Sequence, residues 1–328
     1  MSAHDTNSAP NSGQGRRPVL IVAGPTASGK SALAMDVAER FTGTVINADS
    51  QQVYKELRII SARPSIEDEN RVPHRLFGVL SGHEVCSAGR WCDMAVAQIE
   101  ACFAQNRLPI LAGGTGMYLK SLVEGLSPIP EVPDEIREHA RALHEHLGGE
   151  AFRHEVAKLD PASAEKLPAG DTQRLIRAWE VSTATERAFS DWQDEPRIAL
   201  LQNVRFAHIA LIPDRQKLYD GIEKRFDWMV DHGGLDEVRA LLPLNIDPDK
   251  PLMKALGVPE LAAYLRSEME LEAAVSKAKQ VSRNYAKRQL TWLRSQIPEA
   301  HVISAQYSES FREEIFSFVH QFLLTEQT

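Results

Sequence analysis

The sequence predicts an α/β fold, in which helices flank a parallel sheet and an all-helical segment interrupts the chain. The first observation is that short apolar runs alternate with helix-like segments, as is typical of parallel sheets covered on both faces. The second is that several of these runs end in glycine or aspartate, at the edge where such sheets bind ligands. The third is a stretch bounded by prolines that has helical spacing and no strand pattern.

Order is expected to begin at Pro18, and five apolar runs after it have the length and pattern of buried strands. They lie at 19–23, 44–48, 76–80, 108–112 and 207–212. A helix is expected over 31–41, where Leu33 and Val37 recur at helical spacing. After the fifth run we expect mainly helix, including one long helix over about 270–296.

Prolines bracket the segment that we expect to be inserted. Residues 127–133 contain three prolines and open it, a second break at 190–196 closes it, and helices are expected over 134–147 and 171–185. Residues 1–17 are polar and lack the apolar stretch of a signal peptide, so we expect a disordered tail there. The predicted organisation is a tail at 1–17, a catalytic core formed by 18–125 and 198–328, and a helical insertion at 126–197, with the sheet resuming near Ile198.

Composition excludes several classes of protein. The 328 residues include 37 lysines and arginines against 45 acidic residues, and the net charge of −8 argues against general coating of a polyanion. No apolar run approaches the roughly 18–20 residues that span a bilayer. The three cysteines lack C-x-x-C spacing, so neither a disulfide framework nor a zinc site is indicated. We expect a cytoplasmic protein with no membrane partner and no obligate protein partner.

A phosphate-binding loop follows the first predicted strand. Its residues are Gly24, Pro25, Thr26, Ala27, Ser28, Gly29, Lys30 and Ser31, which match the pattern G-x-x-x-x-G-K-[ST]. Backbone N–H groups of such a loop wrap a phosphate, Lys30 neutralises its charge, and Ser31 can reach Mg²⁺. The motif predicts a P-loop NTPase-like sheet and a phosphate or diphosphate ligand. It does not identify ATP, because the strand at 108–112 ends in glycines rather than in the acid that holds a kinase's metal.

Two polar groups follow other predicted strands. Asp49 ends the strand at 44–48, and Thr115 lies in a Gly-Gly-Thr-Gly turn after the strand at 108–112. Both lie at the sheet edge that carries the phosphate loop. From the residues alone, Asp49 also fits a helix N-cap or a metal ligand, and Thr115 also fits a plain turn before a helix.

The clearest local charge signal is the segment 276–295, which contains six basic residues and no acidic one. The basic residues are Lys277, Lys279, Arg283, Lys287, Arg288 and Arg294. Four of them fall within about a quarter-turn of a helix, whereas Tyr285 and Trp292 gather on another face and are expected to pack in the core. A second basic pair, Arg174 and Arg177, shares one face of a predicted helix. In both places, charge alone favours a solvated face about as much as a nucleic-acid contact.

These motifs together resemble the bacterial tRNA dimethylallyltransferases, which prenylate adenosine 37 of tRNA. Eight segments match in the family's order: GPTASGKS (24–31), INADSQQVY (46–54), SARP (61–64), PHRL (73–76), SAGRW (87–91), AGGTGMYLKSLVEGLSPIP (112–130), DTQRLIRAWEV (171–181) and KQVSRNYAKRQLTWLR (279–294). The resemblance covers most of the chain. Ser61 and Arg63 replace the family's usual Thr and Lys, and Val258-Pro259 replaces a common Tyr-Lys or Tyr-Arg pair.

The resemblance implies a specific reaction. The phosphate loop would hold dimethylallyl diphosphate with Mg²⁺ on Ser31, and Lys30 would stabilise the departing diphosphate. Asp49 would act as general base for the N6 amine of adenosine 37, and Thr115 would contact and orient the target nucleotide. Lys254 stands where the family often has a basic phosphate contact.

The resemblance also implies where tRNA binds. The target base must leave the anticodon loop and enter the site, so residues near the site and in the insertion are expected to contact RNA. The expected contacts are Asp49, Ser50, Gln51, Gln52, Thr115, Arg137, Gln173, Arg174, Leu175, Ile176, Arg177, Arg283 and Lys287. The insertion is thus expected to be a tRNA-binding domain.

Two other functions fit parts of the same pattern. A P-loop kinase of a nucleoside or small metabolite would use the phosphate loop for ATP. An RNA-binding P-loop switch module would use the loop to sense a nucleotide and would form no covalent product. Turnover of ATP with a small acceptor would identify the first, and tRNA binding that responds to nucleotide would identify the second.

Overall fold

The computed structural model describes residues 15–297 and 299–325, which form two compact units. The first unit takes the chain up to Val123 and again from Leu201, and the second is Glu124–Leu200. The sequence placed the corresponding insertion at 126–197.

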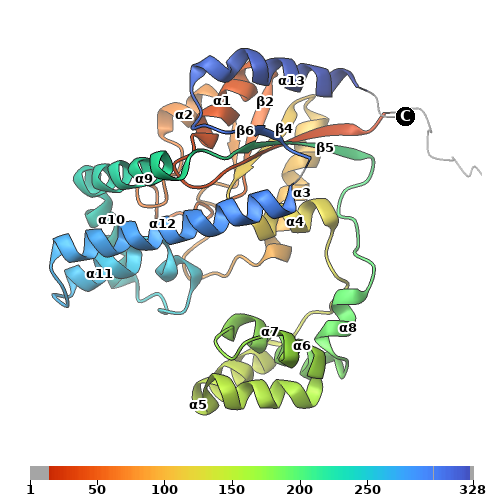
Figure 1. Ribbon diagram of the computed structural model, residues 1–328, viewed down its shortest axis with the longest axis vertical. Helices are drawn as coiled ribbons and strands as arrows, with labels where there is room; N and C mark the ends of the chain where they lie inside the picture. Colours follow the sequence, from red (N-terminus) through yellow and green to blue (C-terminus); the bar gives the residue numbers. More distant parts are fainter. Residues whose placement is uncertain (1–14, 298, 326–328) are drawn as a thin grey trace, which may run out of the picture. The chain divides into compact units, whose positions relative to one another are not determined.

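A single six-stranded sheet forms the centre of the first unit (Figure 1). Its strands are β1 (Arg17–Ala23), β2 (Gly43–Asn47), β3 (His74–Arg75), β4 (Leu108–Gly113), β5 (Val204–Leu211) and β6 (His301–Ile303). All pairings are parallel, in the order β3-β2-β4-β1-β5-β6, so the carboxyl ends of the strands meet at one edge. Residues 19–23 of the central strand β1 are completely buried. This arrangement confirms the predicted P-loop NTPase-like α/β fold.

The strand predicted at 76–80 is wrong. The pairing strand is β3, immediately before it, and Leu76 then adopts a positive φ of 64°, which ends the extended backbone. Only Leu80 pairs again, through a single bridge to Tyr54. The sheet also does not resume near Ile198, because β5 begins six residues later and Ile198 forms one antiparallel bridge with Leu126 within the second unit. Strand β6 was not predicted.

The predicted disordered tail is wrong at its last residue. Residues 1–14 lie outside the described residues, but Arg17 already belongs to β1. Its backbone N–H donates to the carbonyl of Asn203 at 2.7 Å, and its Nη1 lies 2.7 Å from Oε2 of Glu100. The first strand therefore begins two residues before the apolar run at 19–23.

Helices cover both faces of the sheet (Figure 1). They are α1 (Lys30–Arg40), α2 (Ile66–Arg71), α3 (Ala88–Ala104), α4 (Gly116–Glu124), α9 (Arg215–Met229), α10 (Leu235–Leu241), α11 (Val258–Leu265), α12 (Leu271–Gln296) and α13 (Arg312–Leu324), with short turns at η1 (Val230–Gly234), η2 (Leu242–Leu244), η3 (Pro251–Lys254) and η4 (Glu309–Phe311). On one face, Val37 of α1 and Val319 of α13 pack in one core cluster with Leu20 and Ile110 of the sheet. On α3, Trp91 is completely buried and donates from Nε1 to the carbonyl of residue 47 in β2.

The second unit is helical, as predicted, within the described part of the chain. It contains α5 (Asp134–Leu159), α6 (Pro161–Lys166), α7 (Thr172–Thr185) and α8 (Phe189–Asp194). The first helical stretch of α5 ends at residue 147, as predicted, because Gly148 has non-helical angles (φ 74°, ψ 168°), and a second stretch then runs to Leu159. Phe152, Val156 and Leu175 are completely buried in the small core between these helices. The side chain of Leu175, a predicted RNA contact, thus lies in this core, and that of Ile176 packs against it, so a contact by either residue stays a prediction.

Candidate active site

The phosphate loop connects β1 to α1 at the carboxyl edge of the sheet. Ala27 and Gly29 have left-handed backbone angles, with φ of 63° and 89°, and α1 begins directly afterwards at Lys30. A Cβ atom on Gly29 would lie only 2.8 Å from Cβ of Tyr307, so both the angle and the space favour glycine there. The loop thus places the N-terminus of α1, with its positive potential, at the site.

Residues near the end of the chain hold the carbonyl groups of this loop. The backbone N–H of Tyr307 donates to the carbonyl of Ser28 at 2.9 Å, and Nε2 of Gln306 donates to the carbonyl of Ala27 at 3.1 Å. Arg312 on α13 bonds through Nε and Nη2 to the carboxylate of Asp36 on α1 at 2.9 and 3.0 Å. Burial opposes ionisation of Asp36, but its bonds with Arg312 and Tyr307 hold its pKa below the usual range. No motif in the sequence indicated these contacts.

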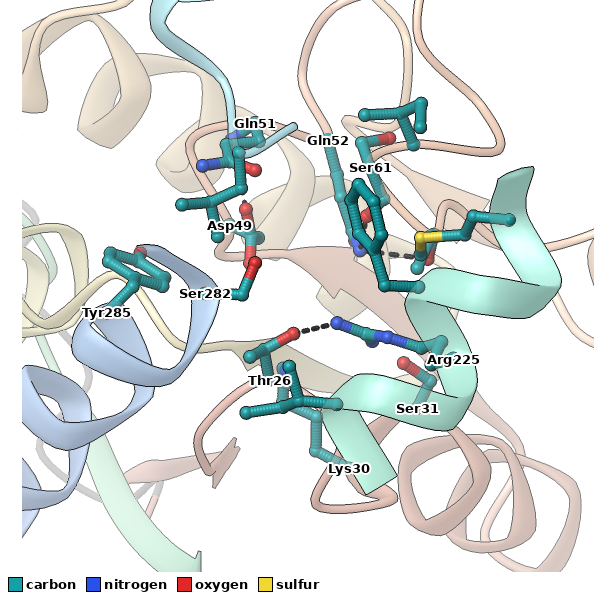
Figure 2. A pocket seen from close by; sticks show the side chains of 16 residues that line it. Thr26, Lys30, Ser31, Asp49, Gln51, Gln52, Ser61, Arg225, Ser282 and Tyr285 are labelled. Atoms are coloured by element: carbon teal, nitrogen blue, oxygen red, sulfur yellow. Dashed lines mark hydrogen bonds between the residues drawn. The ribbon is translucent and has the colours of Figure 1, made fainter. Parts of the chain in front are cut away.

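A cavity opens beside the loop, and Figure 2 shows the side chains that line it. Its polar side includes Thr26, Lys30, Ser31, Asp49, Gln51 and Gln52. Its apolar wall is formed by Ile60, Ile222, Phe226, Met229 and Leu256. A second cavity at the loop shares Lys30 and Ser31 with the first. The structure therefore brings the predicted loop and the predicted acid into one site.

Arg225 on α9 is a member of this site that the sequence analysis missed. It lines both cavities, and its Nη2 donates to Oγ1 of Thr26 in the phosphate loop (Figure 2). Burial lowers the pKa of Lys30 to about 8, Asp49 opposes this shift, and Arg225 adds to it. Burial also lowers the pKa of Arg225, again opposed by Asp49. Two cations thus share the site with one carboxylate, which suits an anionic ligand.

Asp49 belongs to a tight loop that Thr115 helps to hold. The backbone N–H of Asp49 donates to Oδ1 of Asn47 at 2.8 Å, and Oδ1 of Asp49 accepts from the N–H of Gln51 at 2.9 Å. Oγ1 of Thr115 accepts from the N–H of Ser50 at 2.9 Å and lies 3.3 Å from its hydroxyl. The N-cap interpretation of Asp49 is wrong, because turns rather than a helix follow it. Thr115 lies behind the loop and does not line the cavity.

Helix α12 closes the site from the other side. Ser282 and Tyr285 line the cavity, so the prediction that Tyr285 only packs in the core is wrong. Gln289 accepts from the N–H of Thr26 at 2.9 Å through Oε1 and donates to the carbonyl of Gly114 at 3.0 Å through Nε2. One buried amide therefore joins the phosphate loop to the Gly-Gly-Thr turn.

The predicted basic face of α12 is partly neutralised by α9. Nζ of Lys279 lies 2.6 Å from Oδ1 of Asp227, and Nη1 of Arg283 bonds with Oε1 of Glu223. Lys287, Arg288 and Arg294 are exposed. The charge available to a partner is therefore smaller than the sequence suggested.

Lys254 does not reach the cavity. Its Nζ lies 2.8 Å from Oδ1 of Asp249, and it is absent from the lining of the site. It ends the short turn η3, whose neighbour Leu256 supplies the apolar wall instead. The structure offers Arg225, from another helix, as the second cation.

The remaining predicted contacts lie on the second unit. Gln173 is exposed on α7, and the Arg174 side chain is 73% exposed, 2.9 Å from Oδ2 of Asp171. Arg177 lies 3.3 Å from Glu180, as one alternative predicted. On α5, Arg137 lies 3.8 Å from Asp134. All these ion pairs lie within one turn of a helix.

Two further features bear on the type of protein. Within residues 15–297 and 299–325, no helix is long and apolar enough to cross a membrane. In the same part of the chain, no cluster of three or more His, Cys, Asp or Glu side chains could hold a metal ion.

Comparison with known proteins identifies relatives along most of the chain. The model of the IPP transferase family matches residues 52–296. The chain is similar to a tRNA dimethylallyltransferase of Paramagnetospirillum magneticum, with 50% identity over 308 residues that cover 94% of this chain and 98% of that protein. A tRNA dimethylallyltransferase of Rhodospirillum rubrum is 48% identical over 320 residues, covering 96% and 98%.

Solved structures agree with this assignment. The chain is similar to the tRNA isopentenylpyrophosphate transferase of Bacillus halodurans, with a TM-score of 0.67 and 31% identity over 94% of this chain and 97% of that one. A eukaryotic dimethylallyltransferase acting on tRNA has the same fold, with a TM-score of 0.80 at 24% identity, covering 94% and 79%. With the phosphate loop, the carboxylate and two cations gathered in one cavity, this chain belongs to the tRNA dimethylallyltransferase family.

Proposed function

We propose that this protein transfers the dimethylallyl group of dimethylallyl diphosphate to N6 of adenosine 37 in tRNA and releases diphosphate. The observation that carries the proposal is one cavity that combines Lys30 and Arg225 with the carboxylate of Asp49 and an apolar wall. Two cations suit a diphosphate, the wall suits a short hydrocarbon, and the carboxylate suits an amine that must lose a proton. Membership of the family supports the same reaction.

In the proposed reaction, some residues of the cavity act on the leaving diphosphate and others on the N6 amine that attacks. The bond between the allylic carbon and the diphosphate oxygen breaks while N6 forms a bond to the same carbon. The electron pair of the broken bond stays on diphosphate, where Lys30, Arg225 and the N–H groups of the phosphate loop would stabilise the added charge. The N6 proton would pass to an oxygen of Asp49, so the modified amine is neutral.

We also propose that Mg²⁺ accompanies the donor. Ser31 lines both cavities beside Lys30, and a phosphate-bound Mg²⁺ takes only one or two ligands from the protein. When bound, the ion supplies further positive charge at the diphosphate oxygens. Ser31 would hold it, and Lys30 would neutralise the adjoining oxygens.

The proposed macromolecular partner is tRNA, and the proposed compartment is the cytoplasm. Arg174 on the second unit and Lys287, Arg288 and Arg294 on α12 are exposed cations that can contact phosphates. Gln51 and Gln52 lie at the cavity beside Asp49, where their amides can contact an extruded base. The roles of Arg137, Gln173 and Arg177 remain part of this proposal.

The mass of tRNA tests the proposed reaction. Purified protein is incubated with dimethylallyl diphosphate, Mg²⁺ and a tRNA that carries adenosine at position 37. We expect each tRNA to gain one dimethylallyl group in place of a hydrogen, and a tRNA with guanosine at position 37 to gain nothing. An unchanged mass would contradict the proposal. Consumption of ATP with a nucleoside acceptor and no use of the prenyl donor would point to the kinase instead.

A further inference from the structure

The carboxylate of Glu237 binds a row of backbone N–H groups in another part of the chain. Oε1 accepts from the N–H of Arg58 at 2.6 Å and of Ile59 at 2.9 Å, and Oε2 accepts from Ile59 at 3.0 Å and Ile60 at 2.9 Å. Glu237 lies in the first turn of α10, whereas its partners lie more than 170 positions earlier in the sequence. Hydrogen bonds to an ionised carboxylate are stronger than those between neutral groups, so this contact is a firm anchor.

The anchored segment is a compact loop that forms one side of the cavity. Ile60, Ser61 and Ala62 line the cavity. Gln52 donates from Nε2 to the carbonyls of Ser61 and Ala62, both at 2.9 Å, and the Ser61 hydroxyl donates to the carbonyl of Leu57 at 2.7 Å. Glu237 fixes the N–H groups of the loop and Gln52 fixes its carbonyls, so the position of Ile60 depends on both.

The apolar wall has no space behind it. A Cβ atom on Gly234 would lie 2.7 Å from Cδ1 of Ile60, and one on Gly257 would lie 2.8 Å from the ring of Phe226. Ile60 and Phe226 therefore rest directly on backbone, and neither can retreat without a shift of the chain. Gly234 immediately precedes α10, so the element that carries Glu237 also supports Ile60 from behind.

We propose that Glu237 is a positioning residue that fixes Ile60 in the apolar wall and thereby limits the length of the prenyl chain that the donor site accepts. The inference rests on the proposed function, because it takes the wall to hold the hydrocarbon of a prenyl diphosphate. Glu237 itself does not line the cavity and acts only through the loop. Release of the loop gives Ile60 room to move, which weakens contact with a five-carbon chain and admits a ten-carbon chain.

The experiment compares dimethylallyl and geranyl diphosphate as ligands of wild-type protein and of Glu237→Gln, measured by calorimetry and by steady-state kinetics with tRNA. Glutamine keeps the size of the side chain but turns one acceptor into a donor that faces backbone N–H groups. We expect the KM and Kd for dimethylallyl diphosphate to rise on the order of tenfold. We expect the preference for the five-carbon over the ten-carbon donor to fall, while the KM for tRNA is unchanged.

Two further variants make the result decisive. Asp236→Asn is the matched control, because the neighbouring Asp236 side chain is 77% exposed and pairs with Arg239 on the same helix. It should leave donor affinity and donor preference as in the wild type. Ile60→Val tests the wall directly if Glu237→Gln does not fold, and it should shift donor preference in the same direction.

The inference would be overturned if Glu237→Gln lowered the melting temperature or kcat but left the donor KM and the donor preference unchanged. An unchanged donor preference in Ile60→Val would also overturn it. These outcomes differ from failure of the proposed function, in which the wild type transfers no prenyl group to tRNA. Calorimetry separates the two, because it measures how each variant binds the two diphosphates without any transfer. Wild-type protein that binds neither diphosphate would overturn both.

Discussion

Asp49 shows how a single side chain is prepared for its proposed role. Its carboxylate accepts a hydrogen bond from Gln51, and its backbone is held by Asn47, so the loop orients the group at the cavity. Lys30 and Arg225 lie in the same cavity and interact with it electrostatically. A carboxylate so placed is ready to accept a proton from an amine as the C–N bond forms.

The substitution Asp49→Asn should therefore remove catalysis while tRNA still binds. Asparagine keeps the shape and the bond to Gln51 but cannot accept a proton, so we expect kcat to fall by about 10²–10⁴-fold. Gel-shift binding of tRNA should change little. Asp93→Asn, which alters an exposed carboxylate on α3, is the control and should keep full turnover. Undiminished kcat in Asp49→Asn would remove Asp49 from the role of base.

Functional residues could be predicted from the sequence where they belong to a local motif, and could not be predicted where they do not. Lys30 and Asp49 follow buried strands within recognisable motifs, and the structure places both at the cavity. Arg225 and Glu237 lie in helices with several other charged residues, and only the fold brings Arg225 to the cavity and Glu237 to the loop beside it. Lys254 has a similar local context, but the fold turns it to Asp249 instead.

The buried side chain of Asp160 connects helices α6 and α8 of the second unit. Its carboxylate accepts from the N–H and hydroxyl of Ser163 at 2.9 and 2.5 Å, and from those of Ser190 at 2.9 and 2.8 Å. Burial would raise the pKa of Asp160, but these four hydrogen bonds hold it below its usual range. The group thus ties the start of α6 to α8.

This contact predicts a pH-dependent stability. Because the pKa of Asp160 is depressed in the folded state, its contribution is complete above the unfolded pKa of about 4 and is lost as the pH falls through the folded pKa. Asp160→Asn should lower the free energy of unfolding by about 1–3 kcal/mol at pH 7, with a difference from wild type that shrinks below about pH 4. Urea titrations at pH 7 and at pH 3.5 measure this difference in the free energy of unfolding. Hydrogen exchange shows which helices lose protection.

The control for this experiment is Asp191→Asn, which changes an exposed carboxylate on α8. It should leave both titrations close to those of the wild type. A difference between Asp160→Asn and wild type that is the same at pH 7 and at pH 3.5 would contradict the proposed protonation.

Some strands could be predicted from the sequence and others could not. The central strands β1, β2 and β4 are buried on both faces, and their continuous apolar runs made them predictable. Strands β3 and β6 at the edges have two and three residues, too few to create a pattern. Within residues 76–80, Leu76 and Leu80 are buried, although the backbone between them does not form a strand.

Charged side chains of this protein form ion pairs between helices as well as exposed patches of one sign. The net charge of the chain is −8, yet residues 276–295 of α12 include six basic residues and no acidic one. Two of these, Lys279 and Arg283, are paired with acids on α9. The sequence could not show this pairing, because Glu223 and Arg283 are 60 positions apart and meet only in the fold.

This arrangement predicts that two cations of α12 differ in their contribution to tRNA binding. Lys287→Gln should reduce the slope of log K against log salt concentration by about 0.7–0.9, the value for one phosphate contact. Arg283→Gln should reduce it less, because Glu223 already neutralises that charge. Binding curves at four salt concentrations compare the two, and equal slopes would show that the ion pair does not restrict Arg283.

The contacts of Gln306 and Tyr307 with the phosphate loop have a consequence for biosynthesis. The carbonyls of Ala27 and Ser28 are made early in translation, but the groups that hold them follow about 280 residues later. A nascent chain still attached to the ribosome lacks that support until Gln306 and Tyr307 have emerged. The phosphate loop is therefore expected to reach its final geometry late in synthesis, after residues 306 and 307 have folded onto it.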